Sequence, residues 1–139
     1  MTTIAVRDGI MACDSRITGG FISKTPRKVV VGGKCIVGFC GGYAAGYAGA
    51  LFLAGELSDR PETYSEDEEE YIILSPRGIE VADEHLRVAP ISGTFWATGS
   101  GGMAAMAAMY MGATAIEAVR VAVKCDEGSG SPAKEYRLK

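Results

Sequence analysis

Two long stretches without a charged side chain constrain the fold of this chain more than any other feature. They span residues 35–55 and 88–116, and each exceeds the roughly 20 residues that cross a bilayer as a helix. Both are interrupted, the first by Gly41-Gly42 and the second by Pro90 and the glycine-rich turn at 99–102. We therefore interpret each stretch as a buried strand, a glycine turn and a core helix, and not as a membrane span.

Composition limits the classes of protein that fit. The 139 residues suit one domain, and a hydrophobic share of 47% allows a sizeable core. The formal charge of -3 gives no basic surface of the kind that binds nucleic acid. The chain has a single histidine, His85, and its four cysteines show no CxxC spacing, so we expect neither a metal site nor another cofactor.

The compartment follows from the N-terminus and the cysteines. The first residues reach Arg7 and Asp8 too soon for the apolar region of a signal peptide. The cysteines all lie in apolar stretches, which favours buried free thiols in a reducing compartment. We expect a cytoplasmic protein with no membrane partner. The four cysteines are Cys13, Cys35, Cys40 and Cys125.

Short apolar runs alternate with turn residues, and two helical segments follow the glycine turns. Residues 1–139 therefore predict a single domain of the α+β class, with sheets and helices in layers. The helix that begins after Gly41-Gly42 is apolar nearly all round, and we expect it to lie between layers and not on a surface. The expected strands are 3–6, 10–13, 29–31, 34–39, 71–74, 79–81, 95–98 and 135–138, and the expected helices are 42–57, 103–110 and 114–124.

Few residues offer recognisable chemistry. The turn at 99–102 could cradle an anion, but no lysine follows it, so nucleotide binding is a weak interpretation. Thr2 follows Met1 and is small enough for the methionine to be removed, after which its α-amine, with a pKa of about 7.7–8.0, could serve as its own base. Many proteins begin in this way, and such a nucleophile also needs a nearby cation and backbone donors for an oxyanion.

Six short motifs supply that context. Together they resemble proteasome β-subunits and HslV-type peptidases, which are N-terminal nucleophile hydrolases, and the resemblance covers nearly the whole chain. It implies a four-layer αββα sandwich. The motifs, in family order, are residues 1–4 (MTTI), 12–19 (ACDSRITG), 27–29 (RKV), 38–42 (GFCGG), 97–102 (ATGSGG) and 126–130 (DEGSG).

The resemblance assigns catalytic roles to seven residues. Thr2 matches the nucleophile, Lys28 the lysine whose charge keeps the α-amine neutral, and Asp14 the acid that pairs with this lysine. Gly41 matches the backbone N–H donor of the oxyanion hole. Asp126 and Ser129 match residues that orient the threonine amine, and Ser100 lies in the family's Gly-Ser-Gly turn near the nucleophile.

The same resemblance implies a substrate and an assembly. Thr18, Phe39 and Tyr43 fall where the family binds an extended substrate strand. The implied substrate is unfolded polypeptide, and the implied partners are further copies of the chain in a homo-oligomeric ring and an ATP-dependent unfoldase. The chain is shorter than typical members between Leu57 and Tyr71, where relatives have a second long helix, so the assembly and the unfoldase remain open.

Other interpretations stay open. Singly, Asp14 could cap a turn, Lys28 could be an exposed charge on an edge strand, and Ser129 could belong to a tail. An amidase acting on small amides would use the same residues outside a ring. If Met1 is retained, Thr2 has no free amine, and the chain would be an inactive proteasome-like scaffold.

Overall fold

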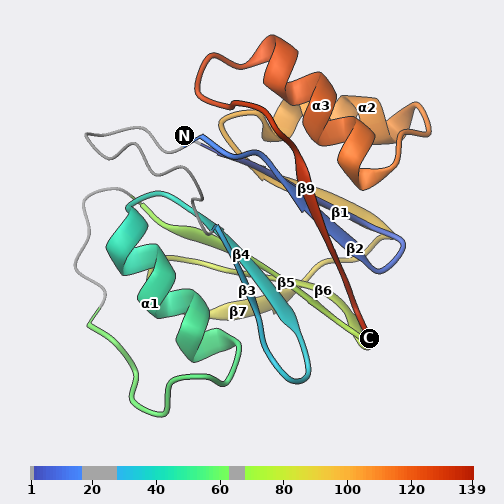
Figure 1. The fold of residues 1–139 in the computed structure, drawn as a ribbon. Helices are drawn as coiled ribbons and strands as arrows, with labels where there is room; N and C mark the ends of the chain where they lie inside the picture. The colour runs from blue at the N-terminus through green and yellow to red at the C-terminus, as the bar shows by residue number, and fades with distance from the viewer. Residues whose placement is uncertain (1, 17–27, 63–67) are drawn as a thin grey trace.

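The computed structural model describes residues 2–16, 28–62 and 68–139, which form four layers (Figure 1). One helix covers one face of a five-stranded sheet, a four-stranded sheet packs on the other face, and two helices cover the far side of that second sheet. The predicted αββα sandwich is thus confirmed. Among the described residues, no helix combines the length and the apolar character needed to span a membrane.

The four-stranded sheet carries both the first and the last strands of the chain. Its order is β8-β1-β2-β9, and all its neighbouring strands are antiparallel. The expected tail strand is present as β9 and pairs with β2. This topology places the start of β1 beside the end of β8, which carries the glycine-rich turn. The strands are β1 (Thr3–Arg7), β2 (Ile10–Cys13), β8 (Phe95–Gly99) and β9 (Lys134–Arg137).

The five-stranded sheet follows chain order, β3-β4-β5-β6-β7, again with antiparallel neighbours. Its last strand, β7, was not predicted from the sequence. That strand is only three residues long, lies at the sheet edge and is exposed, so it lacks the alternating burial that marks a strand. The strands are β3 (Val29–Val31), β4 (Ile36–Cys40), β5 (Glu70–Ser75), β6 (Gly78–Ala82) and β7 (Val88–Pro90).

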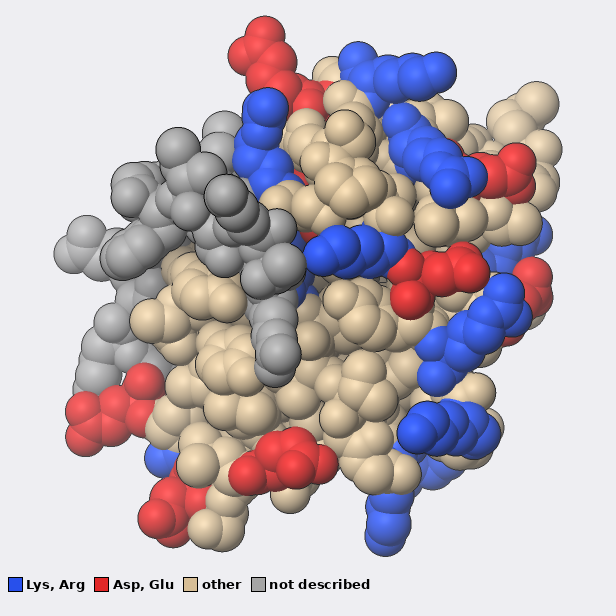
Figure 2. Space-filling view, in the orientation of Figure 1, with Lys and Arg blue, Asp and Glu red and all other residues tan. Residues whose placement is uncertain are grey.

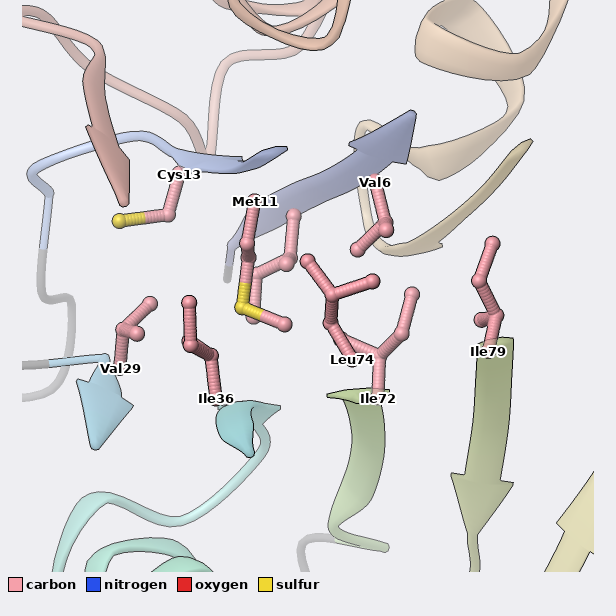
Figure 3. Packing of buried hydrophobic residues seen from close by; sticks show 9 residues of the cluster. Val6, Met11, Cys13, Val29, Ile36, Ile72, Leu74 and Ile79 are labelled. Carbon is pink, nitrogen blue, oxygen red and sulfur yellow. The ribbon is translucent and has the colours of Figure 1, made fainter. Parts of the chain in front are cut away.

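Aliphatic side chains from both sheets form the central core. Figure 3 shows Val6 and Met11 pointing from the four-stranded sheet toward Ile36, Ile72 and Leu74 of the other sheet. All five side chains are at most 4% exposed. Strands such as β1 and β4 are covered on both faces, so they read as nearly continuous hydrophobic runs, as the sequence indicated.

Two helices, α2 (Gly102–Tyr110) and α3 (Ala115–Cys125), cover the outer face of the four-stranded sheet. A capping box starts α3: the Thr114 hydroxyl accepts from the Glu117 N–H, and the Glu117 carboxylate accepts from the Thr114 N–H. Small residues such as Ala118 are fully buried at this contact, which lets the helix approach the sheet closely.

The remaining helix, α1 (Tyr43–Leu53), differs from expectation in two ways. It ends at Leu53 and not near Leu57, because Gly55 takes a left-handed φ of 81° and the N–H groups of Gly55 and Glu56 bond back to Phe52 and Leu51. It also forms an outer layer, not an inner one, and its outward side chains stay partly exposed. The described residues between Leu53 and β5 contain no helix, as the shortened segment predicts.

Candidate active site

The Thr2-Thr3 peptide, at the start of β1, lies against the glycine-rich turn after β8. The hydroxyl of Ser100 and the N–H of Gly101 both lie 3.4 Å from the Thr2 carbonyl oxygen. A Cβ atom at Gly99 would come within 2.0 Å of that oxygen, and a Cβ atom at Gly101 within 1.9 Å of Thr3 Oγ1. Glycine is therefore required at both positions for the turn to approach this peptide.

A buried ion pair lies on the other side of the same peptide. Lys28 Nζ donates to Asp14 Oδ1 at 2.8 Å, and the N–H of Thr3 donates to the same oxygen at 3.0 Å. The second oxygen accepts from the N–H groups of Arg16 at 3.1 Å and Gly130 at 2.9 Å. Asp14 is 1% exposed and Lys28 3% exposed. The pair is thus desolvated, and the Asp14 carboxylate keeps four donors to compensate.

Burial sets the charge state of the lysine. Removal from water lowers the pKa of Lys28 below its ordinary value, and the neighbouring Asp14 carboxylate partly opposes this shift. Without Asp14, the desolvated lysine would lose its proton more readily. The acid therefore both places the lysine beside the Thr2-Thr3 peptide and favours its charged form.

A second carboxylate, Asp126, joins two serines. Its Oδ2 atom accepts from Ser100 Oγ and from Ser129 Oγ, each at 2.6 Å. These hydrogen bonds hold the pKa of Asp126 below its usual range. Ser129 Oγ also lies 2.7 Å from Thr3 Oγ1. Because the Ser129 proton goes to the carboxylate, the Thr3 hydroxyl donates to Ser129.

These contacts join six of the seven predicted catalytic residues in one network around Thr2. It runs from Lys28 through Asp14 to Thr3, and from Thr3 through Ser129 and Asp126 to Ser100 at the Thr2 carbonyl. The seventh, Gly41, lies outside this network, in the other sheet just after β4, where it is exposed and has a left-handed φ of 99°. A glycine adopts that conformation without strain.

The predicted substrate-binding residues are only partly covered by the structure. Thr18 lies outside the described residues. Phe39 is buried, and its ring centroid lies 6.0 Å from that of Tyr43 and 6.3 Å from that of Tyr47. Tyr43 and Tyr47 stack on one another at 6.2 Å. The aromatic residues on either side of Gly41 in the chain thus form a cluster, and Tyr43 is its most exposed member, with 38% of its surface accessible.

Three residues of the site were missed in the sequence. Thr3 is central to the network, and Gly130 supplies one of the donors to Asp14. Glu70, at the start of β5, forms a short hydrogen bond with the Thr98 hydroxyl and so links the two sheets beside Gly41. Thr3 could have been found by its place next to Thr2 and Gly130 by its motif, but Glu70 sits in an acidic run that is typical of a solvated surface.

Two of the cavities that the described residues form bear on the position of the site. One, of about 710 Å³, lies beside the candidate site and includes Thr98 and Gly99 in its lining. The other, of about 1090 Å³, is at the opposite end of the sandwich, near the C-terminus, and contains no candidate catalytic residue. Figure 2 shows Lys and Arg side chains on the C-terminal side of the molecule, and Arg77 and Arg137 line this second cavity. This cavity is therefore separate from the candidate site around Thr2.

Comparison with known structures identifies the architecture. No protein-family profile matches the sequence, and no curated protein matches it. Thiobacillus denitrificans BPH in complex with epoxomicin aligns with a TM-score of 0.68 and 22% identity, over 99% of this chain and 97% of that chain. A second solved structure of Thiobacillus denitrificans BPH aligns with a TM-score of 0.66 and 22% identity, over 99% of this chain and 97% of that chain. Eukaryotic HslV from Trypanosoma brucei aligns with a TM-score of 0.69 and 19% identity, over 99% of this chain and 98% of that chain.

The fold is that of HslV and BPH. The two BPH structures and the HslV structure each align over nearly the full length of both chains, so the similarity is one of the whole sandwich and not of a fragment. The expected HslV-like architecture is confirmed on this basis. At identities of 19–22% the chemistry has to be argued from the residues of this chain.

Proposed function

We propose that this chain is a threonine peptidase in which Thr2, freed by removal of Met1, attacks peptide bonds. The observation that carries the proposal is the network around Thr2. A buried lysine–carboxylate pair lies on one side of the Thr2-Thr3 peptide, and a serine–carboxylate–serine set lies on the other. A purely structural role would not require a charged lysine in a desolvated position, which costs stability.

The proposed reaction has two stages. The Thr2 hydroxyl oxygen bonds to the substrate carbonyl carbon while its proton passes to the α-amine of Thr2. The amine then delivers that proton to the leaving nitrogen as the C–N bond breaks, which leaves an ester on Thr2. Water, deprotonated by the same amine, hydrolyses this ester and restores the free hydroxyl.

The surrounding residues adjust this chemistry. The positive charge of Lys28 favours the neutral, basic form of a nearby amine, because two like charges repel. Asp14 keeps that charge in place. Ser100, Asp126 and Ser129 fix the peptide that carries the nucleophile, which reduces the entropy lost on reaching the reactive geometry. The Gly41 N–H is proposed to donate to the oxyanion, a contribution of roughly 3 kcal/mol in other hydrolases.

The substrate and the assembly are part of the same proposal. An unfolded polypeptide would lie as an extended strand along Thr18 and the accessible Tyr43, which the buried Phe39 supports from beneath, with main-chain hydrogen bonds that recognise many sequences. A nucleophile with so little selectivity would cleave other proteins unless it were enclosed. We therefore propose a homo-oligomeric ring in the cytoplasm, to which an ATP-dependent unfoldase delivers the substrate. The epoxomicin found with BPH is a suitable first ligand, and we expect it to raise the unfolding temperature of this protein.

Peptide hydrolysis by three forms of the protein tests the proposal. We expect the wild-type chain to release a fluorogenic group from short peptides, Thr2→Ala to be inactive, and Thr2→Ser to retain measurable activity because it keeps the hydroxyl. Circular dichroism should show that all three are folded. Equal activity in Thr2→Ala and the wild type would disprove the role of Thr2.

Two alternatives predict different results. An amidase for small amides would cleave the short fluorogenic peptides but leave casein intact, whereas the peptidase degrades both. An inactive scaffold would cleave neither and would keep Met1. Sedimentation of the wild-type protein at micromolar concentration tests the ring, and a stable monomer would contradict it.

A further inference from the structure

A groove beside the nucleophile has no role in the mechanism above. It is the cavity of about 710 Å³ whose lining includes Thr98 and Gly99, and it runs between the β8–α2 segment and strands β5 and β6. Gly99 packs directly on the Thr2 carbonyl. A molecule bound in this groove would therefore lie next to the peptide that carries the nucleophile.

One wall of the groove is an uncovered face of α2. This helix is apolar on all sides, yet α3 and the four-stranded sheet cover only part of it. Met103 is 88% exposed and Tyr110 74% exposed, with the half-buried Met106 and Trp96 beside them in the groove. Large apolar side chains left in water in this way mark interaction sites. Methionines suit partners of varied shape, because the thioether chain is flexible and polarisable.

The opposite rim is acidic. Glu70, Asp83 and Glu84 line it, and none of the described residues that line the groove is Lys or Arg. Asp83 accepts from the Arg87 guanidinium at 2.7 Å, and Glu84 lies 3.7 Å from His85. The negative charge of Asp83 is thus largely balanced by Arg87, so the charge available to a ligand comes mainly from Glu70 and Glu84.

Of the three carboxylates that line the groove, Glu70 is the one bonded to Thr98, the residue next to Gly99. In the described part of the chain its contacts are the Thr98 hydroxyl and the Cys40 thiol, both neutral groups. Burial, and after it the charge of Glu70, raises the pKa of Cys40 to about 11, so the thiol stays protonated at neutral pH. A carboxylate with neutral neighbours at the edge of an apolar groove attracts a cation.

We propose that this groove binds polypeptide segments in which a lysine or arginine adjoins a large apolar residue. The apolar side chain lies against α2 and Trp96, and the cation lies toward Glu70. The inference deepens the proposed peptidase function, because the groove would hold substrate next to Thr2. Binding itself does not require hydrolysis, so the two can fail separately.

The fluorescence of Trp96 reports binding directly, since the chain has one tryptophan. The experiment uses the Thr2→Ala protein, which cannot consume a peptide, and titrates it with a ten-residue peptide of alternating leucine and lysine. We expect a saturable change in Trp96 emission. A matched peptide with glutamate in place of each lysine should bind at least about tenfold more weakly, because its charges meet Glu70 and Glu84. Equal affinities would overturn the proposal.

Variants locate the binding. Glu70→Gln and Met103→Ser should each lower the affinity for the leucine–lysine peptide by about fivefold to tenfold. That is the change expected when one contact at the surface is lost. Met111→Ser is the matched control: Met111 is 89% exposed but does not line the groove, and its change should leave the affinity unaltered. Unchanged affinity in Met103→Ser would place the peptide elsewhere and overturn the proposal.

The groove could instead be filled by a second copy of the chain. Sedimentation of wild type and Met103→Ser distinguishes this occupant, because the substitution would then dissociate an oligomer. That result would overturn the proposal of a peptide site. If peptides bind as expected but the wild-type protein hydrolyses none of them, the groove proposal stands and the proposed peptidase function fails.

Discussion

The two carboxylates of the candidate site work in different surroundings. Asp14 is almost completely buried and receives four donors, one of them the ammonium group of Lys28. Asp126 is partly exposed, and the side chains bound to it are two neutral hydroxyls, from Ser100 and Ser129. The comparison separates two tasks. The region of Asp14 holds a charge inside the protein, so it should govern stability, whereas the region of Asp126 orients the nucleophile and should govern rate.

The largest effect on stability is expected for Asp14→Ala. It removes the carboxylate paired with the buried Lys28 and the acceptor of three N–H groups, and breaking such a buried pair costs about 3–5 kcal/mol. Urea unfolding measures this change. Asp59→Ala is the control, because Asp59 is exposed and its φ is not left-handed, and it should change the free energy of unfolding by less than about 0.5 kcal/mol. A similar, small loss in both variants would contradict the comparison.

Close packing, and not charge, dominates on the other side of the Thr2-Thr3 peptide. In Gly101→Ala the new methyl group would meet Thr3 Oγ1 at 1.9 Å, so we expect a loss of about 1–3 kcal/mol. Gly33→Ala is matched to it, since nothing lies within 4 Å of a Cβ atom there and its φ is not left-handed. Thermal unfolding of both variants tests the difference. If Gly33→Ala is the more damaging, the close approach of the turn is refuted.

Asp126→Asn should cost less stability than Asp14→Ala but should reduce the rate of peptide hydrolysis. The amide still accepts one hydrogen bond, so we expect a stability loss near 1 kcal/mol, while peptide hydrolysis falls at least about tenfold because the Thr2 carbonyl and Thr3 hydroxyl lose their fixed partners. Parallel measurements of kcat and urea unfolding test this. A stability loss equal to that of Asp14→Ala would remove the distinction between the two regions.

The smallest effect concerns pH. Because hydrogen bonds hold the pKa of Asp126 below its usual range, the unfolded chain takes up a proton there at higher pH than the folded protein does. The contribution of this carboxylate is thus fully present above the ordinary pKa of about 3.9 and is lost as pH falls through the lowered value. The stability gap between wild type and Asp126→Asn should therefore narrow from pH 6 to pH 3. A gap that widens on acidification would contradict the assignment.

The sequence predicted much of the fold, since continuous apolar runs and glycine turns depend on local pattern. The strand β7 escaped notice because its three residues carry no such pattern, and α1 ended early because Gly55 takes a left-handed conformation. In the candidate site, the family motifs predicted Asp14, Lys28 and the two serines. They did not predict Glu70, whose role depends on a contact with Thr98 in the other sheet, 28 positions away. Contacts between sheets are set by packing and leave little trace in a local motif.

The contacts around Thr2 can serve the proposed reaction only if Thr2 is the first residue, since only a free α-amine can act as its base. The intact mass of the purified protein tests this claim most directly. We predict the mass of a chain that begins at Thr2. A mass that includes Met1 on every molecule would contradict the account, because the proposed base would then be part of a peptide bond.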